Sequence, residues 1–193
     1  MGRMLNLIGL CLGLAGCEAG SARQSAMGDV AMRWDSQAMG ETWTAATRAA
    51  VLSHGSSLVE TVPGDIVHWC PAYPEADAET RALFWTGLIS ALAYHESTWN
   101  PRAVGGGGRW FGLLQIAPGT ARGYGCKATT GPELQNGAAN LSCGVRIMAS
   151  TVARDGVVSQ GMRGVAADWG PFYSQRKRRD MIDWVSSQPF CVG

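Results

Sequence analysis

The segment from residue 78 to residue 96 constrains the fold most, because it carries the longest helical pattern of the chain. Counting back from Glu96 in steps of four gives an apolar residue each time: Leu92, Leu88 and Phe84. Residues four apart lie on one face of a helix, so this face is expected to point into a core. Asn100-Pro101 prevents the helix from continuing much further. The pattern therefore predicts a helix that ends with a carboxylate on its buried side.

Helical patterns also dominate the rest of the chain. Further helices are expected over residues 118–122, 137–154 and 173–187. Few segments alternate between polar and apolar residues as strands do, apart from a short stretch near residues 110–116. The expected fold class is mainly α, with one short irregular or β-like segment, and 193 residues correspond to one domain.

The first 16 residues have the build of a secretory signal peptide, with Arg3 before a short apolar run and small residues up to Cys17. The sequence Leu14-Ala15-Gly16-Cys17 resembles the bacterial lipobox, in which the cysteine is lipid-modified and becomes the mature N-terminus. The alternative is an ordinary cleaved signal with a chance cysteine. Glu18, where an inner-membrane lipoprotein would carry aspartate, favours the outer membrane. We therefore expect a periplasm-facing lipoprotein of the bacterial cell envelope.

Residues 17–61 are rich in Ala, Ser, Gly and Met and show little sustained periodicity. We expect them to form a tether, with at most a loose helix around residues 41–52. The compact domain is then expected over residues 62–193.

Because the protein is expected to be exported, its cysteines are expected to enter an oxidising compartment. Without Cys11 in the signal peptide and Cys17 at the lipid anchor, four remain: Cys70, Cys126, Cys143 and Cys191. An even number in an oxidising compartment predicts two disulfides, and the absence of CxxC and HExxH spacings argues against a metal site. Four cysteines allow three pairings. Proximity in sequence favours Cys126–Cys143, which leaves Cys70–Cys191.

Glu96 has two interpretations. A carboxyl group on an apolar stripe loses hydration, which raises its pKa, and a raised pKa suits a general acid near neutral pH. The alternative is that Glu96 only ends the helix and faces water, as most helix-terminal glutamates do. Periodicity alone favours the alternative.

Three motifs in order resemble those of the soluble lytic transglycosylase (SLT) family of the lysozyme-like superfamily. They are Glu96-Ser97 followed by Asn100-Pro101, then Gly112-Leu113-Leu114-Gln115-Ile116, then Asn140-Leu141-Ser142-Cys143-Gly144. The resemblance extends over about residues 83–169, roughly half of the chain. The sequence Gly-Tyr-Gly-Cys at residues 123–126 resembles a cysteine-bearing bacterial subgroup of that family. The resemblance implies a goose-type, SLT-like domain.

The resemblance also implies cleavage of the β-1,4 bond between N-acetylmuramic acid (MurNAc) and N-acetylglucosamine (GlcNAc) in peptidoglycan, without cofactor or metal. Glu96 would protonate the leaving oxygen and then accept the proton of the 6-hydroxyl of the same MurNAc, which closes a 1,6-anhydro ring. Ser97 would orient Glu96, while Gln115 and Asn140 would bind sugar N-acetyl or hydroxyl groups. Three aromatic residues are expected either to stack on sugars or to pack in the core: Trp99, Trp110 and Phe111.

One segment departs from the family pattern. Where the family usually has Ala-Tyr-Asn-Ala-Gly, this chain has Ala-Ala-Asp-Trp-Gly at residues 166–170, without the tyrosine that helps to position the acid. Either Trp169 or Tyr173 is expected to replace it, or the cleft is built differently. Asp168 could then serve as the second carboxylate of a lysozyme-type hydrolase, with Glu133 and Asp155 as weaker candidates. A solvated surface position is the default for all three.

Other classes of function receive less support. The net charge of +1 gives no reason to expect nucleic acid as a partner. The glycine run 105–108 lacks the Gly-Lys-Ser/Thr of a phosphate-binding loop. A lipoprotein that binds peptidoglycan without cleaving it remains an alternative, which the changed segment 166–170 favours and Glu96 opposes. The expected partners are peptidoglycan glycan strands and, through the lipid anchor, a membrane, and the protein is expected to be a monomer.

Overall fold

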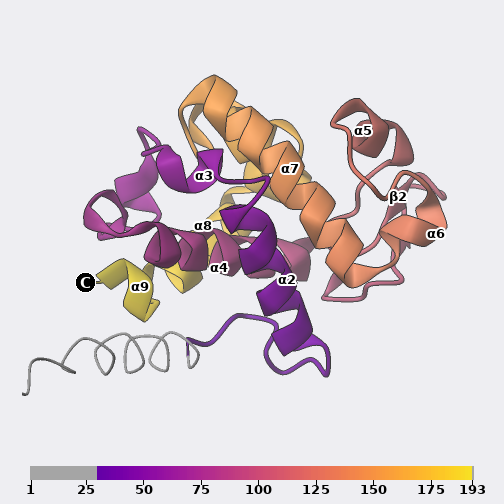
Figure 1. Ribbon diagram of the computed structural model, residues 1–193, viewed down its shortest axis with the longest axis horizontal. Coiled ribbons are helices and arrows are strands. Elements are labelled where there is room, and N and C mark those ends of the chain that lie inside the picture. The colour runs from indigo at the N-terminus through magenta and orange to yellow at the C-terminus, as the bar shows by residue number, and fades with distance from the viewer. Residues whose placement is uncertain (1–29, 193) are drawn as a thin grey trace, which may run out of the picture. The chain divides into compact units, whose positions relative to one another are not determined.

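The computed structural model describes residues 30–192, most of which lie in helices (Figure 1). The α-helices are α2 (Gly40–Leu52), α3 (Ser57–Glu60), α4 (Ala78–Ser97), α5 (Pro118–Gly123), α6 (Gly131–Leu134), α7 (Gly137–Asp155), α8 (Gln175–Ser186) and α9 (Pro189–Val192). Short 3-10 helices are η1 (Ile66–His68), η2 (Tyr73–Glu75), η3 (Gln160–Met162), η4 (Gly164–Ala167) and η5 (Gly170–Tyr173). The strands are β1 (Val104–Gly105) and β2 (Trp110–Phe111). The prediction of a mainly α fold is confirmed.

The compact unit begins at Met32 and not near residue 62. Trp34 and Trp43 are buried against each other, and α2 packs against both α4 and α7 (Figure 1). The prediction of a tether is therefore wrong for residues 32–61. The buried side of α2 combines Trp43 with Thr47 and Ala50, a weak apolar pattern, so tertiary contacts stabilise this helix more than its own sequence does. The predicted signal peptide, the lipid-attachment residue Cys17 and the start of the tether lie outside the described residues.

Helix α4 is the central helix of this unit and packs against α2, α3, α8 and α9. The Asp77 side chain caps its start by accepting a hydrogen bond from the backbone N–H of Thr80. Every residue from 82 to 93 is buried, so the expected apolar stripe is one side of a helix that the core surrounds. The helix ends at Thr98, which takes a left-handed conformation with φ of 52°. Glu96 thus lies where the buried helix reaches the surface.

Strands β1 and β2 form a short antiparallel hairpin directly after α4. This hairpin confirms the β-like segment expected near residues 110–116, and a bridge from Phe111 to Ile116 closes the loop that follows it. The turn needs a glycine at position 106, because φ there is +57° and a Cβ atom would collide with the Trp110 ring. The hairpin therefore brings the Trp110 ring against the backbone of the opposite strand.

Both predicted disulfides are present. Cys70 joins Cys191 across 121 residues, and Cys126 joins Cys143 across 17 residues. The first links the segment after η1 to the C-terminal helix α9. The second ties the loop after α5 to α7. Pairing by proximity in sequence is confirmed.

Candidate active site

The largest hollow next to Glu96 is a cleft of about 530 Å³ between the end of α4, the hairpin, α8 and the segment around residue 170. Its lining residues are His95, Glu96, Gly105, Gly106, Trp110, Gln115, Asp168, Trp169, Gly170, Pro171 and Lys177. A smaller hollow of about 70 Å³ shares Trp110, Gln115, Asp168 and Trp169 with it and extends towards α5. The cleft therefore combines two carboxylates, a lysine and two indole rings.

Glu96 occupies the last turn of α4 with its carboxyl group half-buried in this cleft. Burial raises the pKa of Glu96 to about 7, and the positive charge of Lys177 opposes that rise. Within residues 30–192, no hydrogen bond or ion pair engages the carboxyl group. A carboxyl of this kind is partly protonated at neutral pH and is able to give its proton to a ligand in the cleft.

Lys177 reaches the cleft because α8 is tied to the end of α4. The Asp180 carboxylate accepts two hydrogen bonds from the Arg33 guanidinium, at 2.6 and 3.0 Å, and lies 2.7 Å from Nε2 of His95. The hydrogen bonds from Arg33 hold the pKa of Asp180 below its usual range. Nearly one helical turn earlier on α8, Lys177 donates from Nζ to the backbone oxygen of His95 at 3.5 Å. The lysine charge is thereby held beside Glu96.

Ser97 joins the end of α4 to the loop that carries the Gly-Leu-Leu-Gln-Ile motif. Its Oγ donates to the backbone oxygen of Leu113 at 2.9 Å and lies 3.2 Å from that of Ala93. The hydroxyl group therefore makes no direct contact with the carboxyl group of Glu96. It fixes the backbone on which Glu96 sits.

Asn140 does not face the cleft, so the expectation that it binds sugar is wrong. The side chain is fully buried, and its Oδ1 accepts from the backbone N–H of Leu114 at 2.9 Å. Its Nδ2 donates to the backbone oxygens of Phe111 and Leu134, each at 2.9 Å. Three backbone groups occupy the amide, which therefore shapes the loop before Gln115 and leaves no group for a ligand.

Gln115 lies in the cleft with a left-handed backbone, φ of 49°. Its Nε2 donates to the backbone oxygens of Gly112, at 2.9 Å, and Ala103, at 3.3 Å. Its Oε1 lies so close to Gly105 that a Cβ atom there would collide with it. Because the amide nitrogen is engaged, Oε1 is the atom of Gln115 left to accept a hydrogen bond from a sugar.

Of the two residues expected to replace the family tyrosine, Trp169 lines the cleft and Tyr173 does not. Trp169 is buried, and its Nε1 donates to the backbone oxygen of Leu114 at 2.9 Å. Tyr173 is 61% exposed and is not among the lining residues. Trp110 also lines the cleft and is 44% exposed, so its ring is open to a ligand. The Trp99 indole instead donates to the backbone oxygen of Ser90.

Asp168 is the second carboxylate of the cleft. Burial raises its pKa, while a hydrogen bond from the Tyr124 hydroxyl, at 3.3 Å, opposes the rise. The two weaker candidates lie elsewhere. Glu133 caps the start of α6, and Asp155 binds Arg154 and the N–H of Gly164.

Lys177 and Tyr124 are functional candidates that sequence reasoning missed. Lys177 belongs to the basic run 176–179, and a run of this kind usually forms the solvent-exposed face of a helix. Yet Lys177 precedes the buried residues Met181 and Val185 by four and eight positions, so it shares their inward face. That periodicity could have revealed the lysine. Tyr124 has no comparable signal, because only the fold brings it to Asp168.

The fold and the cleft define a lysozyme-like class of protein, in which a half-buried glutamate ends the central helix. Residues 74–160 match the model of a family described as Transglycosylase SLT domain. Its members are lytic transglycosylases, lyases that act on peptidoglycan, and the chain is an enzyme of this class. A protein of this kind acts in the cell envelope.

Solved structures of Bd0314 DslA are similar to the chain over most of its length. Two of them are glutamate-to-glutamine mutants, each with a TM-score of 0.77 and 25% identity over 84% of this chain and 98% of that chain. The wild type in its second form has a TM-score of 0.72 at 24% identity over the same shares. The similarity thus extends beyond residues 74–160. No curated protein matches the chain.

Proposed function

We propose that this enzyme cleaves the β-1,4 bond between MurNAc and GlcNAc and leaves a 1,6-anhydro-MurNAc end. The observation that carries the proposal is Glu96, whose pKa of about 7 lets one carboxyl group act first as an acid and then as a base. The carboxyl group is half-buried and has no partner among residues 30–192, so it is available to the substrate. No second carboxylate is needed when the nucleophile is part of the substrate.

The reaction proceeds in two proton transfers. Protonated Glu96 gives its proton to the glycosidic oxygen, and the bond from MurNAc C1 to that oxygen breaks. The oxygen of the MurNAc 6-hydroxyl then attacks C1, while the Glu96 carboxylate accepts the proton of that hydroxyl. This transfer regenerates the protonated acid. No water is consumed. The positive charge of Lys177 stabilises the carboxylate between the two transfers.

The sugar is bound by side chains that have an exposed ring face or an unoccupied hydrogen-bond acceptor. The exposed face of Trp110 suits a sugar ring, and Oε1 of Gln115 is able to accept from a hydroxyl or N-acetyl N–H group. Ser97 and Trp169 act as positioning residues, because each binds a backbone oxygen of the loop 113–114.

Asp168 supports a second candidate function, hydrolysis of the same bond in the manner of a lysozyme. It lines the same cleft as Glu96, and an inverting hydrolase uses a second carboxylate to activate a water molecule. A peptidoglycan-binding protein without activity is a weaker candidate, because the raised pKa of Glu96 has no use in binding alone.

Product analysis separates these candidates. Purified protein is incubated with peptidoglycan sacculi, and the soluble fragments are identified by mass spectrometry. We expect 1,6-anhydro fragments, each lighter by one water than the hydrolytic product. Free reducing-end MurNAc would instead favour hydrolysis and assign Asp168 a catalytic role, and no release at all would favour a binding protein.

We also propose that a lipid on Cys17 anchors the monomeric enzyme to the outer membrane, with its domain in the periplasm. The residues that carry this proposal lie in the lipobox-like sequence 14–17. No helix within residues 30–192 has the length and hydropathy to span a bilayer. Incorporation of labelled palmitate into the wild type but not into Cys17→Ser would support the anchor. Equal labelling of both would overturn it.

A further inference from the structure

A second groove of about 550 Å³ runs along α7 and shares no lining residue with the cleft. Its floor is the face of α7 that presents Arg146 and the small residues Ala149, Ser150 and Ala153. His54 and Ser57 form one wall, and Gly123 and Tyr124 form the other. Small side chains on the floor allow a ligand to approach the helix closely.

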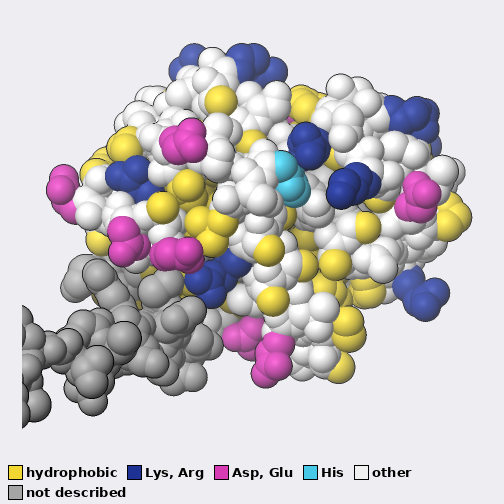
Figure 2. Space-filling model, viewed as in Figure 1, with side chains coloured by type: hydrophobic (Ala, Val, Ile, Leu, Met, Phe, Trp, Pro, Cys, Tyr) yellow, Lys and Arg dark blue, Asp and Glu magenta, His cyan; other side chains and the backbone are white. Residues whose placement is uncertain are grey.

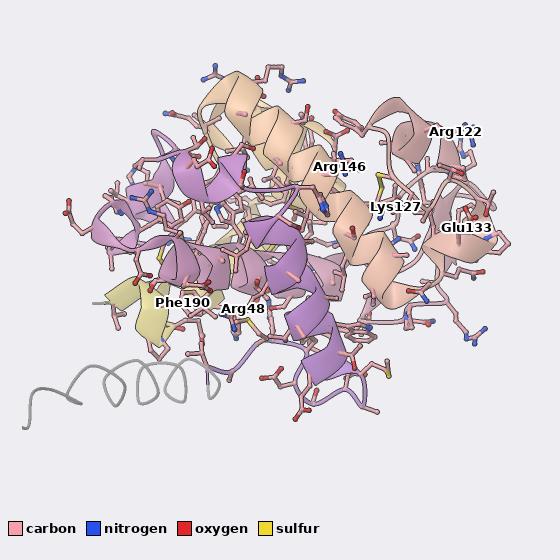
Figure 3. All side chains as sticks on the ribbon, viewed as in Figure 1. Arg48, Arg122, Lys127, Glu133, Arg146 and Phe190 are labelled. Carbon is pink, nitrogen blue, oxygen red and sulfur yellow. A yellow bond between two sulfur atoms is a disulfide. The ribbon has the colours of Figure 1, made fainter. Side chains whose placement is uncertain are left out.

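The groove is positively charged. Arg146 is half-buried in it and makes no ion pair or hydrogen bond within the described part of the chain. No aspartate or glutamate of residues 30–192 lines the groove, whereas two carboxylates line the cleft. Figure 2 shows Lys and Arg side chains and a histidine gathered on this face. In Figure 3, Arg146 on α7 and Lys127 occupy this side of the molecule.

Hydrogen-bond donors accompany the charge. His54 closes one side of the groove, with Nε2 at 3.0 Å from the backbone oxygen of Ser142, so this ring atom is already engaged within the protein. The Arg146 guanidinium offers up to five N–H groups in a planar fork that matches a carboxylate. Arg146 thus offers donors and a positive charge to an anion in a groove whose lining residues include no carboxylate.

Both walls are fixed to α7. The Cys126–Cys143 disulfide holds the loop with Tyr124 and Lys127, and it lies nearly one helical turn before Arg146. On the other wall, Ser57 donates from Oγ to the backbone oxygen of Ala149 at 3.3 Å. The groove is therefore formed before any ligand arrives, which lowers the entropy lost on binding.

Tyr124 connects the groove to the cleft. Its ring lines the groove, and its hydroxyl donates to Asp168, which lines the cleft. The groove and the cleft therefore meet at this pair of side chains, with Tyr124 in the groove and Asp168 in the cleft. Peptidoglycan carries peptide substituents with free carboxylates on its MurNAc residues.

We propose that the groove along α7 is a binding site for the peptide substituents of peptidoglycan, with Arg146 paired to a peptide carboxylate. The proposal rests on the proposed function, because the cleft supplies the sugar to which the peptide is attached. It adds specificity for substituted glycan over bare glycan.

The test measures binding in the Glu96→Gln background, where turnover does not change the ligand. The ligands are short soluble glycan chains that carry peptides and the same chains after an amidase has removed the peptides. We expect Arg146→Gln to weaken binding of peptide-bearing chains by about fivefold, the effect of one partly exposed charge-assisted hydrogen bond. Binding of bare chains should not change.

Two matched variants complete the design. Arg146→Lys keeps the charge but loses the planar fork, so it should weaken binding of peptide-bearing chains less than Arg146→Gln does. Arg179→Gln removes an exposed charge from α8, away from the groove, and should leave both affinities unchanged. Equal effects of Arg146→Gln on both ligands, or no effect on either, would overturn the proposal. Failure of the proposed function would appear separately, as hydrolytic products or no turnover by the wild type.

Discussion

The chemistry of Glu96 depends on the position at which α4 ends. The last turn of the helix emerges from the core, so the carboxyl group is half-buried and faces the cleft. The change that tests this role is Glu96→Gln, which keeps the shape but removes the proton. We expect release of soluble fragments from sacculi to fall by about 10²–10⁴-fold or more. Near-normal turnover would contradict the assignment. The circular dichroism spectrum should match that of the wild type.

Lys177 should set the pH at which Glu96 works. Glu96 must be protonated to begin the reaction, so kcat/KM is expected to fall as pH rises through a value of about 7. Lys177→Met removes the charge that lowers the pKa of Glu96, so this alkaline limb should move to higher pH.

The matched control for this shift is Arg176→Gln, which removes the neighbouring exposed cation on the same helix. It should leave the pH profile in place. An alkaline limb that stays fixed in Lys177→Met, or moves to lower pH, would show that the lysine does not act on Glu96.

At the scale of elements, two asparagines near the start of α7 offer a comparison. Asn136 is an exposed N-cap, and its replacement by Ala should lower the free energy of unfolding by ~1 kcal/mol. Asn140→Ala leaves buried backbone groups of Leu114, Phe111 and Leu134 without partners and should lower it by ~3 kcal/mol. Urea unfolding measures both. Similar losses from the two variants would mean that the loop does not depend on Asn140.

Helices with local signals were predicted closely from the sequence. The helix expected over residues 78–96 is α4, and the one expected over 137–154 is α7, because side-chain caps and an apolar face mark both. Residues 32–61 were misassigned because α2 and α3 are stabilised by contacts with α4 and α7. In the candidate site, too, residues that come together only through tertiary contacts could not be predicted from the sequence. Glu96 and Gln115 were found from their motifs, whereas Tyr124 enters only through the packing of distant segments.

At the scale of the whole molecule, the two disulfides should differ in their contribution to stability. Replacing Cys126 and Cys143 by serine opens a loop of 17 residues, for which the chain-entropy model gives ~3 kcal/mol. Replacing Cys70 and Cys191 opens a loop of 121 residues, for which the same model gives more than ~4.5 kcal/mol. Urea unfolding of the two double variants should therefore rank the second as less stable. The reverse order would show that local packing outweighs chain entropy.

The half-buried carboxyl of Glu96 has a consequence for the stability of the folded chain. Below pH 4.5, its ordinary pKa, it is protonated in both the folded and the unfolded state and has no differential effect. Between pH 4.5 and about 7 the unfolded chain releases the proton first, so the folded state loses stability as pH rises, and above that range the loss is constant. Glu96→Gln should therefore raise Tm at pH 8 but not at pH 4.

The exposed residue Glu41, replaced by Gln, serves as the control and should show no such dependence on pH. An equal Tm for the wild type and Glu96→Gln at pH 8 would show that burial does not penalise the charge. If the difference is found, selection for heat resistance alone at neutral pH would favour loss of the residue on which the proposed reaction depends. Evolution of this chain for durability and evolution for activity would then act in opposite directions at a single position.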